Sequence, residues 1–191
     1  MIHRFQQIVL ITTFIGFSWL GMQVVHELGH VIAAVFTGAE VTKVALHPLI
    51  MSRTDLAENP HPLTVVWGGP LCGVLFPLLA FFVAAAFRLP GVYLLRFFAA
   101  FCLIANGVYI GVGHFFAEGA DPGVMLENGS PKWLLLLFGA AAIPLGLYLW
   151  HRQGPHFGLG SANGKVNPGA TLVSAGLFLS LAAAELLRNV R

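Results

Sequence analysis

Charged residues are scarce in this chain of 191 residues: only 9% are Asp, Glu, Lys or Arg, while 57% are hydrophobic. A soluble domain carries about 25% charged residues. The mean hydropathy of +0.80 and this shortage of charge exclude an ordinary soluble domain and indicate a polytopic membrane protein. No stretch outside the apolar runs is long enough to fold alone. The net charge of +2 comes from basic residues scattered at the ends of these runs, so no nucleic-acid partner is expected.

Cysteine is also scarce, and the two cysteines, Cys72 and Cys102, fall in different apolar runs. Neither belongs to a CxxC pair, so we expect no disulfide framework and no thiolate metal site. The basic residues divide evenly between the two expected sides of the membrane, so the positive-inside rule gives no orientation.

Five apolar runs are long enough to cross a bilayer as helices, which predicts an all-α polytopic membrane protein with a single domain over residues 1–191. The first run is expected to be a retained span rather than a cleaved signal peptide, because no small-residue cleavage site precedes its polar residues. Between the first and second runs, the alternating segment 41–47 predicts a short strand, with a second strand at 49–53. A flexible loop is expected over 151–169. The expected spans cover residues 5–36, 63–87, 97–116, 133–150 and 170–187.

Inside the first span lies the sequence His26-Glu27-Leu28-Gly29-His30, an HExxH motif. On a helix, residues four apart share one face, so His26 and His30 can bind the same Zn²⁺. Glu27 then falls beside the metal, where it can act as general base. The alternative is a pair of interfacial histidines with a surface glutamate. That alternative leaves a carboxylate in an apolar span unexplained, and polar groups are costly there.

Three separate motifs are expected to meet near one face of the membrane. The HExxH motif lies toward the end of the first span, Gly69-Pro70 begins the second, and Asp121 follows the third. A catalytic zinc needs a third protein ligand. Asp121 is the best candidate, because it sits in an Asp-Pro-Gly break at the matching depth. A turn or helix-cap role is its alternative. Three other residues are weaker candidates for the third ligand: His114, Glu118 and Glu127.

On this reading, His26, His30 and Asp121 hold Zn²⁺ as the cofactor, and Glu27 takes a proton from the attacking water and passes it to the leaving amine.

These motifs resemble those of the site-2 proteases, which are zinc intramembrane metalloproteases. The resemblance covers about residues 25–123: the HExxH span, a Gly-Pro segment in the next span, and an aspartate after the third. Three features differ from the family pattern. The Asn-Pro that the family often has shortly before the aspartate is missing here, with Asn106 a distant candidate. Gly73 stands where the family often has Asn, and Pro122 follows the aspartate where the family has Gly.

The resemblance implies a small bacterial-type member that cleaves a membrane protein or peptide, in regulated intramembrane proteolysis. It further implies substrate contacts from Gly69, Pro70 and Gly73, and a multi-pass protein of the inner membrane with its site nearer the cytosol. It leaves the oligomeric state open. A non-proteolytic zinc-binding regulator or scaffold is the alternative function. A small transporter is a further alternative, which the clustering of polar residues near one face disfavours.

Overall fold

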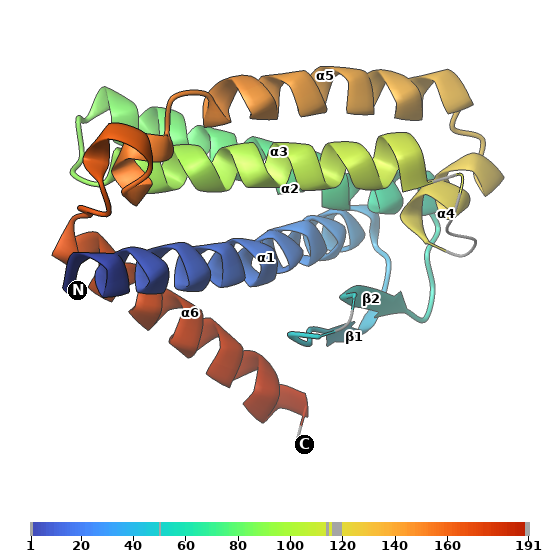
Figure 1. Ribbon diagram of the computed structural model, residues 1–191. Helices are drawn as coiled ribbons and strands as arrows, with labels where there is room; N and C mark the ends of the chain where they lie inside the picture. The colour runs from blue at the N-terminus through green and yellow to red at the C-terminus, as the bar shows by residue number, and fades with distance from the viewer. Residues whose placement is uncertain (1, 50, 114, 116–119, 190–191) are drawn as a thin grey trace.

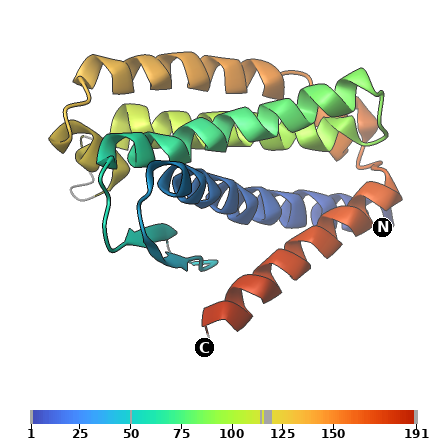
Figure 2. The same ribbon diagram turned by 180° about the vertical axis from the view of Figure 1, so that it is seen from behind.

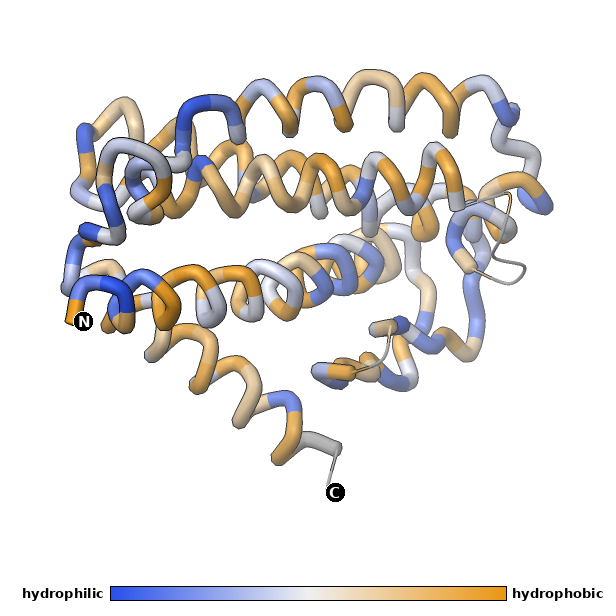
Figure 3. Tube along the Cα trace, in the orientation of Figure 1, coloured by the Kyte–Doolittle hydropathy of each residue, from blue (hydrophilic) through white to orange (hydrophobic). Residues whose placement is uncertain are grey.

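The computed structural model describes residues 2–49, 51–113, 115 and 120–189. Five of its helices are long and apolar enough to cross a membrane, which indicates an integral membrane protein and confirms the expected fold class. They are α1 (Ile2–Thr37), α2 (Pro62–Ala86), α3 (Val92–Gly113), α5 (Lys132–Trp150) and α6 (Pro168–Asn189). Figure 3 shows hydrophobic residues along most of these helices, with hydrophilic ones at the start and in the second half of α1, around the hairpin that follows it, and in the connection between α5 and α6.

The helices α1, α2, α3 and α5 lie side by side, whereas α6 crosses α1 and diverges from it (Figures 1 and 2). Helix α3 packs against α2 and α5, and α1 packs against α2 and α6. One end of the bundle therefore gathers the end of α1, the start of α2, the end of α3 and the short helix α4 (Asp121–Glu127). The three sequence motifs lie at this end, as their order along the spans predicted.

Close contact between α1 and α2 depends on a pair of glycines. A methyl group built on Gly68 would lie 2.6 Å from the carbonyl oxygen of Gly29, the residue before His30. Small residues allow helix backbones to approach closely where side chains would hold them apart. The Gly29–Gly68 contact therefore brings the start of α2 directly against the HExxH turn.

A two-stranded antiparallel hairpin connects α1 to α2. Strand β1 (Val41–Ala45) pairs with β2 (Arg53–Leu56), and Val44 lies opposite Thr54. The first strand lies where the alternation predicted it, although it ends two residues early. The second predicted strand is also present, but its predicted bounds of 49–53 are wrong, because β2 begins at Arg53; Ile50 is outside the described residues. The reason is tertiary: the N–H of Ser52 donates to Gln23 Oε1 on α1 (2.9 Å) instead of pairing with β1.

The segment around Asp121 is helical rather than an open turn. Asp121 is the first residue of α4 and Pro122 occupies its first turn, a position where proline needs no N–H partner. An acidic residue there also interacts favourably with the helix dipole. Met125, fully buried against Val66, Ile110 and Leu135, packs α4 onto the bundle. The α4 backbone, and with it Asp121, is therefore fixed by packing.

The connection from α5 to α6, expected to be flexible, is folded. It contains two short 3₁₀ helices, η1 (Gly154–Phe157) and η2 (Gly160–Ala162). Phe157 is buried against Leu10 and Phe14 of α1, and Gln7 Nε2 donates to its carbonyl oxygen (3.1 Å). Glycine and asparagine in this stretch serve as turn residues with positive φ, so composition alone misread an ordered loop.

Candidate metal centre

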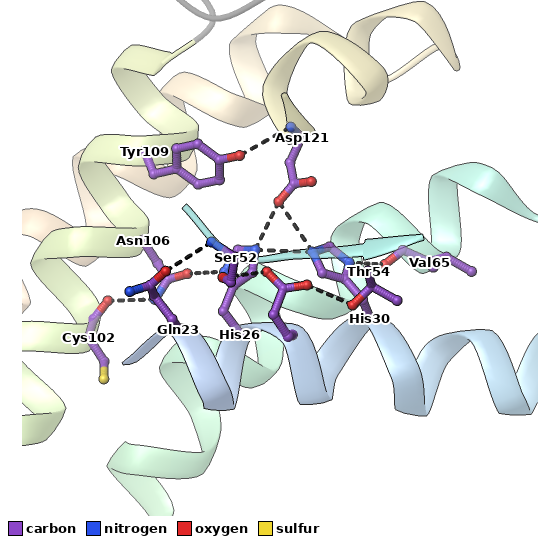
Figure 4. Close-up of polar contacts among 11 residues, drawn as sticks. Gln23, His26, His30, Ser52, Thr54, Val65, Cys102, Asn106, Tyr109 and Asp121 are labelled. Carbon is purple, nitrogen blue, oxygen red and sulfur yellow. Dashed lines mark hydrogen bonds and ion pairs between the residues drawn. The ribbon is translucent and has the colours of Figure 1, made fainter. Parts of the chain in front are cut away.

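Helix α1 presents two buried imidazoles on one face. The Nε2 atoms of His26 and His30 lie 3.1 Å apart, as the spacing of four residues predicts. Figure 4 shows both rings turned toward Asp121, which comes from α4 on the opposite side of the site. Its Oδ2 lies 2.8 Å from His26 Nε2 and 3.3 Å from His30 Nε2. The three predicted ligands therefore converge through one atom each.

The separations among these three atoms suit a metal ion. Ligands bound tetrahedrally at about 2.0–2.1 Å lie about 3.3 Å from one another. The observed separations of 2.8, 3.1 and 3.3 Å are close to that value. The hydroxyl of Tyr109 accepts the Asp121 backbone N–H (3.3 Å), which adds a second restraint on the aspartate. Burial raises the pKa of Asp121, but the His26 and His30 imidazoles lower it more when either carries an extra proton, so the pKa then lies below its usual range.

The contact made by Nδ1 of each imidazole fixes which nitrogen of that ring carries the proton. His30 Nδ1 lies 2.9 Å from the carbonyl oxygen of Val65, which can only accept, so Nδ1 carries the proton. His26 Nδ1 lies 2.7 Å from Asn106 Oδ1. Asn106 Nδ2 donates to the Cys102 carbonyl (2.9 Å), which leaves the oxygen of the amide facing His26. Carbonyl partners of this kind orient metal-binding histidines and fix their tautomer.

With both protons on Nδ1, each Nε2 presents a lone pair to the other ring and to the Asp121 carboxylate. Three acceptors within 3.3 Å of one another repel unless a cation or an extra proton lies among them. This arrangement of three acceptors makes the site chemically suited to a cation.

Glu27 lies beside the imidazoles and is almost fully buried. Ligand atoms of His26, Glu27 and His30 all lie within 4.8 Å of one another, so this group could hold a metal ion. Both oxygens of Glu27 also accept hydroxyl hydrogen bonds from the hairpin: Ser52 Oγ donates to Oε1 (2.7 Å) and Thr54 Oγ1 to Oε2 (2.6 Å). Glu27 is therefore engaged by the hairpin, whereas Asp121 faces the two rings.

Gly69, Pro70 and Gly73, the predicted substrate residues, are buried within α2 and pack against the site. A methyl on Gly69 would lie 2.8 Å from His26 Nε2 and closer still to His30. A methyl on Gly73 would lie 2.8 Å from Asn106 Oδ1. In the structure, these glycines make room for the imidazoles and for the amide that orients His26; contact with substrate stays a prediction.

The remaining ligand candidates lie apart from the cluster or outside the described residues. Glu127 is exposed at the far end of α4 from Asp121. His114 and Glu118 are among the residues that the structure does not describe. The structure adds three residues to the site, namely Asn106, Ser52 and Thr54, and sequence reasoning assigned none of them a role there.

A cavity of about 1030 Å³ opens at the candidate centre. One part is bounded by the ligands and by residues 51–56 of the hairpin. The other extends between α1 and α3, past Trp19, Phe101 and Ile104. The cavity lining thus combines the polar cluster with apolar residues of α1 and α3.

Comparison of the chain with protein-family models, curated proteins and solved structures finds no match. The similarity to site-2 proteases therefore rests on the motifs in the sequence.

Proposed function

We propose that this protein is a zinc-dependent intramembrane endopeptidase that hydrolyses a peptide bond within or beside the bilayer. The observation that carries the proposal is the meeting of His26 Nε2, His30 Nε2 and Asp121 Oδ2, three acceptors that face one another at 2.8–3.3 Å. Two imidazoles and a carboxylate are a common ligand set for catalytic zinc, with one position left open. The HExxH sequence and the resemblance to site-2 proteases, which rest on the same residues, point to the same chemistry.

Asp121 is the third ligand in this proposal, and Glu27 is the base. Asp121 Oδ2 lies 2.8 Å from His26 Nε2 and 3.3 Å from His30 Nε2. Both oxygens of Glu27 already accept hydroxyl groups, and its carboxylate stands off to the side. A base needs to reach its proton directly or through one water. A Glu27 oxygen lies within 4.8 Å of a ring nitrogen of both His26 and His30, which allows this.

When bound, the ion supplies Lewis-acid polarisation of a peptide carbonyl and of the attacking water. Glu27 accepts the proton of that water and returns it to the leaving amine, so that the amine departs neutral. Asn106 and Val65 keep the imidazoles in the orientation that directs Nε2 toward the centre.

The substrate in this proposal is a membrane protein or a hydrophobic peptide. The cavity runs from the ligands to Trp19 and Phe101, so an apolar segment can lie between α1 and α3 while its peptide bond reaches the cluster. By the resemblance, the protein resides in a bacterial inner membrane with the site nearer the cytosol.

Metal analysis and peptide cleavage by the purified protein in lipid nanodiscs test this proposal. We expect about one zinc per chain, and we expect Glu27→Gln to keep that zinc while slowing cleavage of a hydrophobic peptide about 10²–10⁴-fold. His151→Ala, which alters an exposed histidine at the other end of the bundle, is the control. Full cleavage by Glu27→Gln would remove Glu27 as the base. Stoichiometric zinc without cleavage would point instead to the zinc-binding regulator.

A further inference from the structure

We propose that Ser52 and Thr54 are positioning residues, whose hydroxyls hold the Glu27 carboxylate in its working orientation only while the hairpin is seated on α1. The inference rests on the proposed role of Glu27 as base. It adds a part for the hairpin, which no motif in the sequence indicated.

The contacts join the start of β2, with Ser52 just before it, to helix α1. Residues two apart on a strand point to the same face, and residues four apart on a helix share a face. Ser52 and Thr54 on the hairpin thus meet Gln23 and Glu27 on α1. Three hydrogen bonds join them: the Ser52 N–H to Gln23, the Ser52 hydroxyl to Glu27, and the Thr54 hydroxyl to Glu27.

Burial makes these hydroxyls important to Glu27. The residue is only 3% exposed, and the two hydroxyls donate one hydrogen bond to each of its carboxylate oxygens. A buried carboxylate without donors is strongly disfavoured. Each carboxylate oxygen has two lone pairs, so an oxygen that accepts one hydroxyl can still accept the proton of a water molecule. The two hydroxyl hydrogen bonds from Ser52 and Thr54, which we call the clasp, therefore orient Glu27 and leave its oxygens able to accept a proton from water.

Because Ser52 and Thr54 belong to the hairpin, a molecule that contacts the hairpin also affects the orientation of Glu27. Met51, next to Ser52, is 56% exposed and lines the cavity. Leu49, two residues earlier, is 87% exposed. An apolar peptide that enters the cavity therefore meets the hairpin beside the clasp. Movement of this strand would displace both hydroxyls from Glu27 together, because they belong to the same short segment.

The double variant Ser52→Ala/Thr54→Val removes both hydroxyls with little change in volume. We expect kcat for a hydrophobic peptide to fall about 10–100-fold, with KM and zinc content unchanged. The swapped variant Ser52→Thr/Thr54→Ser keeps both hydroxyls and should retain most of the activity. Thr42→Val is the matched control, because its hydroxyl lies in the same hairpin but donates to the Asp55 carbonyl. A kcat for the double variant equal to that of Thr42→Val overturns the proposal, as does an equal loss in the swapped variant.

A thermal cycle tests the contact without any need for activity. In the wild-type background the double variant should lower the apparent melting temperature by about 4 °C or more, because it leaves a buried carboxylate without donors. In a Glu27→Ala background the same pair of changes should have almost no effect. Equal shifts in both backgrounds would show that the hydroxyls do not act through Glu27. If the wild-type protein neither binds zinc nor cleaves peptide, the proposed function fails, yet this cycle still decides whether the clasp exists.

Discussion

The two halves of α1 use the same helix for different purposes. The first half buries Leu10 and Phe14 against aromatic rings of α3 and η1, with Phe14 lying 5.5 Å from Phe97 and 6.1 Å from Phe157 between ring centroids. The second half buries Gln23, His26, Glu27 and His30, and each accepts or shares a hydrogen bond with another element. The first half packs mainly through apolar contacts, with one buried hydrogen bond from Gln7 to the Phe157 carbonyl. The second half needs particular partners at particular atoms.

This contrast has an energetic consequence. Aromatic packing depends on many weak contacts, so a single truncation weakens it gradually. A buried polar group that loses its one partner pays the full cost of being unsatisfied. We therefore expect changes in the first half of α1 to reduce stability and changes around the second half to reduce metal binding. The following predictions test that separation, from the largest effect to the smallest.

His26→Ala should abolish stoichiometric zinc binding, because two ligands no longer hold the ion as three do. The helical circular dichroism should remain, since the aromatic half of α1 is untouched. Metal analysis after gel filtration measures the effect, with His151→Ala as the control. Wild-type zinc content in His26→Ala would remove this imidazole from the site.

Phe14→Ala should reduce stability and leave zinc binding intact. We expect a loss of about 2–3 kcal/mol in unfolding free energy, less than the roughly 3–5 kcal/mol seen in soluble cores, because unfolded helices remain in lipid. Denaturation in mixed micelles measures it. The folded fraction should keep the zinc content of the wild type; its loss would show that the two halves of α1 are coupled.

Asn106→Ala should weaken zinc affinity about 10–100-fold, because His26 loses the carbonyl acceptor that fixes its tautomer. Competition with a chelator of known affinity gives the value. Asn128→Ala is a suitable comparison, since that exposed amide donates only to the Val124 carbonyl of its own helix. Equal affinities for the two variants would deny Asn106 an orienting role.

Gly73→Ala should produce a smaller loss of zinc affinity by the same route. The new methyl would lie 2.8 Å from Asn106 Oδ1 and 2.9 Å from Nδ2, so the amide must move relative to His26. In an Asn106→Ala background, the glycine substitution should have little further effect. Gly176→Ala, where a methyl meets nothing within 4 Å, provides the control.

Arg53→Ala should have the smallest effect of all. Its ion pair with Asp55 (3.0 Å) is exposed to solvent, since the two side chains are 66% and 40% exposed. Exposed pairs contribute little, so stability should change by no more than about 0.5 kcal/mol. Thermal denaturation checks this, and a large loss would mean that the hairpin depends on surface charge more than on its clasp.

Much of the fold could be predicted because the bilayer imposes simple rules on length and hydropathy. The five spans and the first strand follow from composition and alternation. The HExxH spacing and the depth of Asp121 place three candidate ligands near one another. A second strand was expected as well, but its start could not be placed, because it depends on the contact between Ser52 and Gln23.

The amino-acid sequence by itself determined that His26 and His30 share a helix face, because four residues make about one turn wherever the helix lies. It also determined that five apolar segments form membrane-spanning helices. Only the tertiary structure decided that Asn106 orients His26 and that Ser52 and Thr54 bind Glu27. These partners lie 25 to 80 residues apart along the chain, and no local pattern specifies which distant donor meets which buried acceptor.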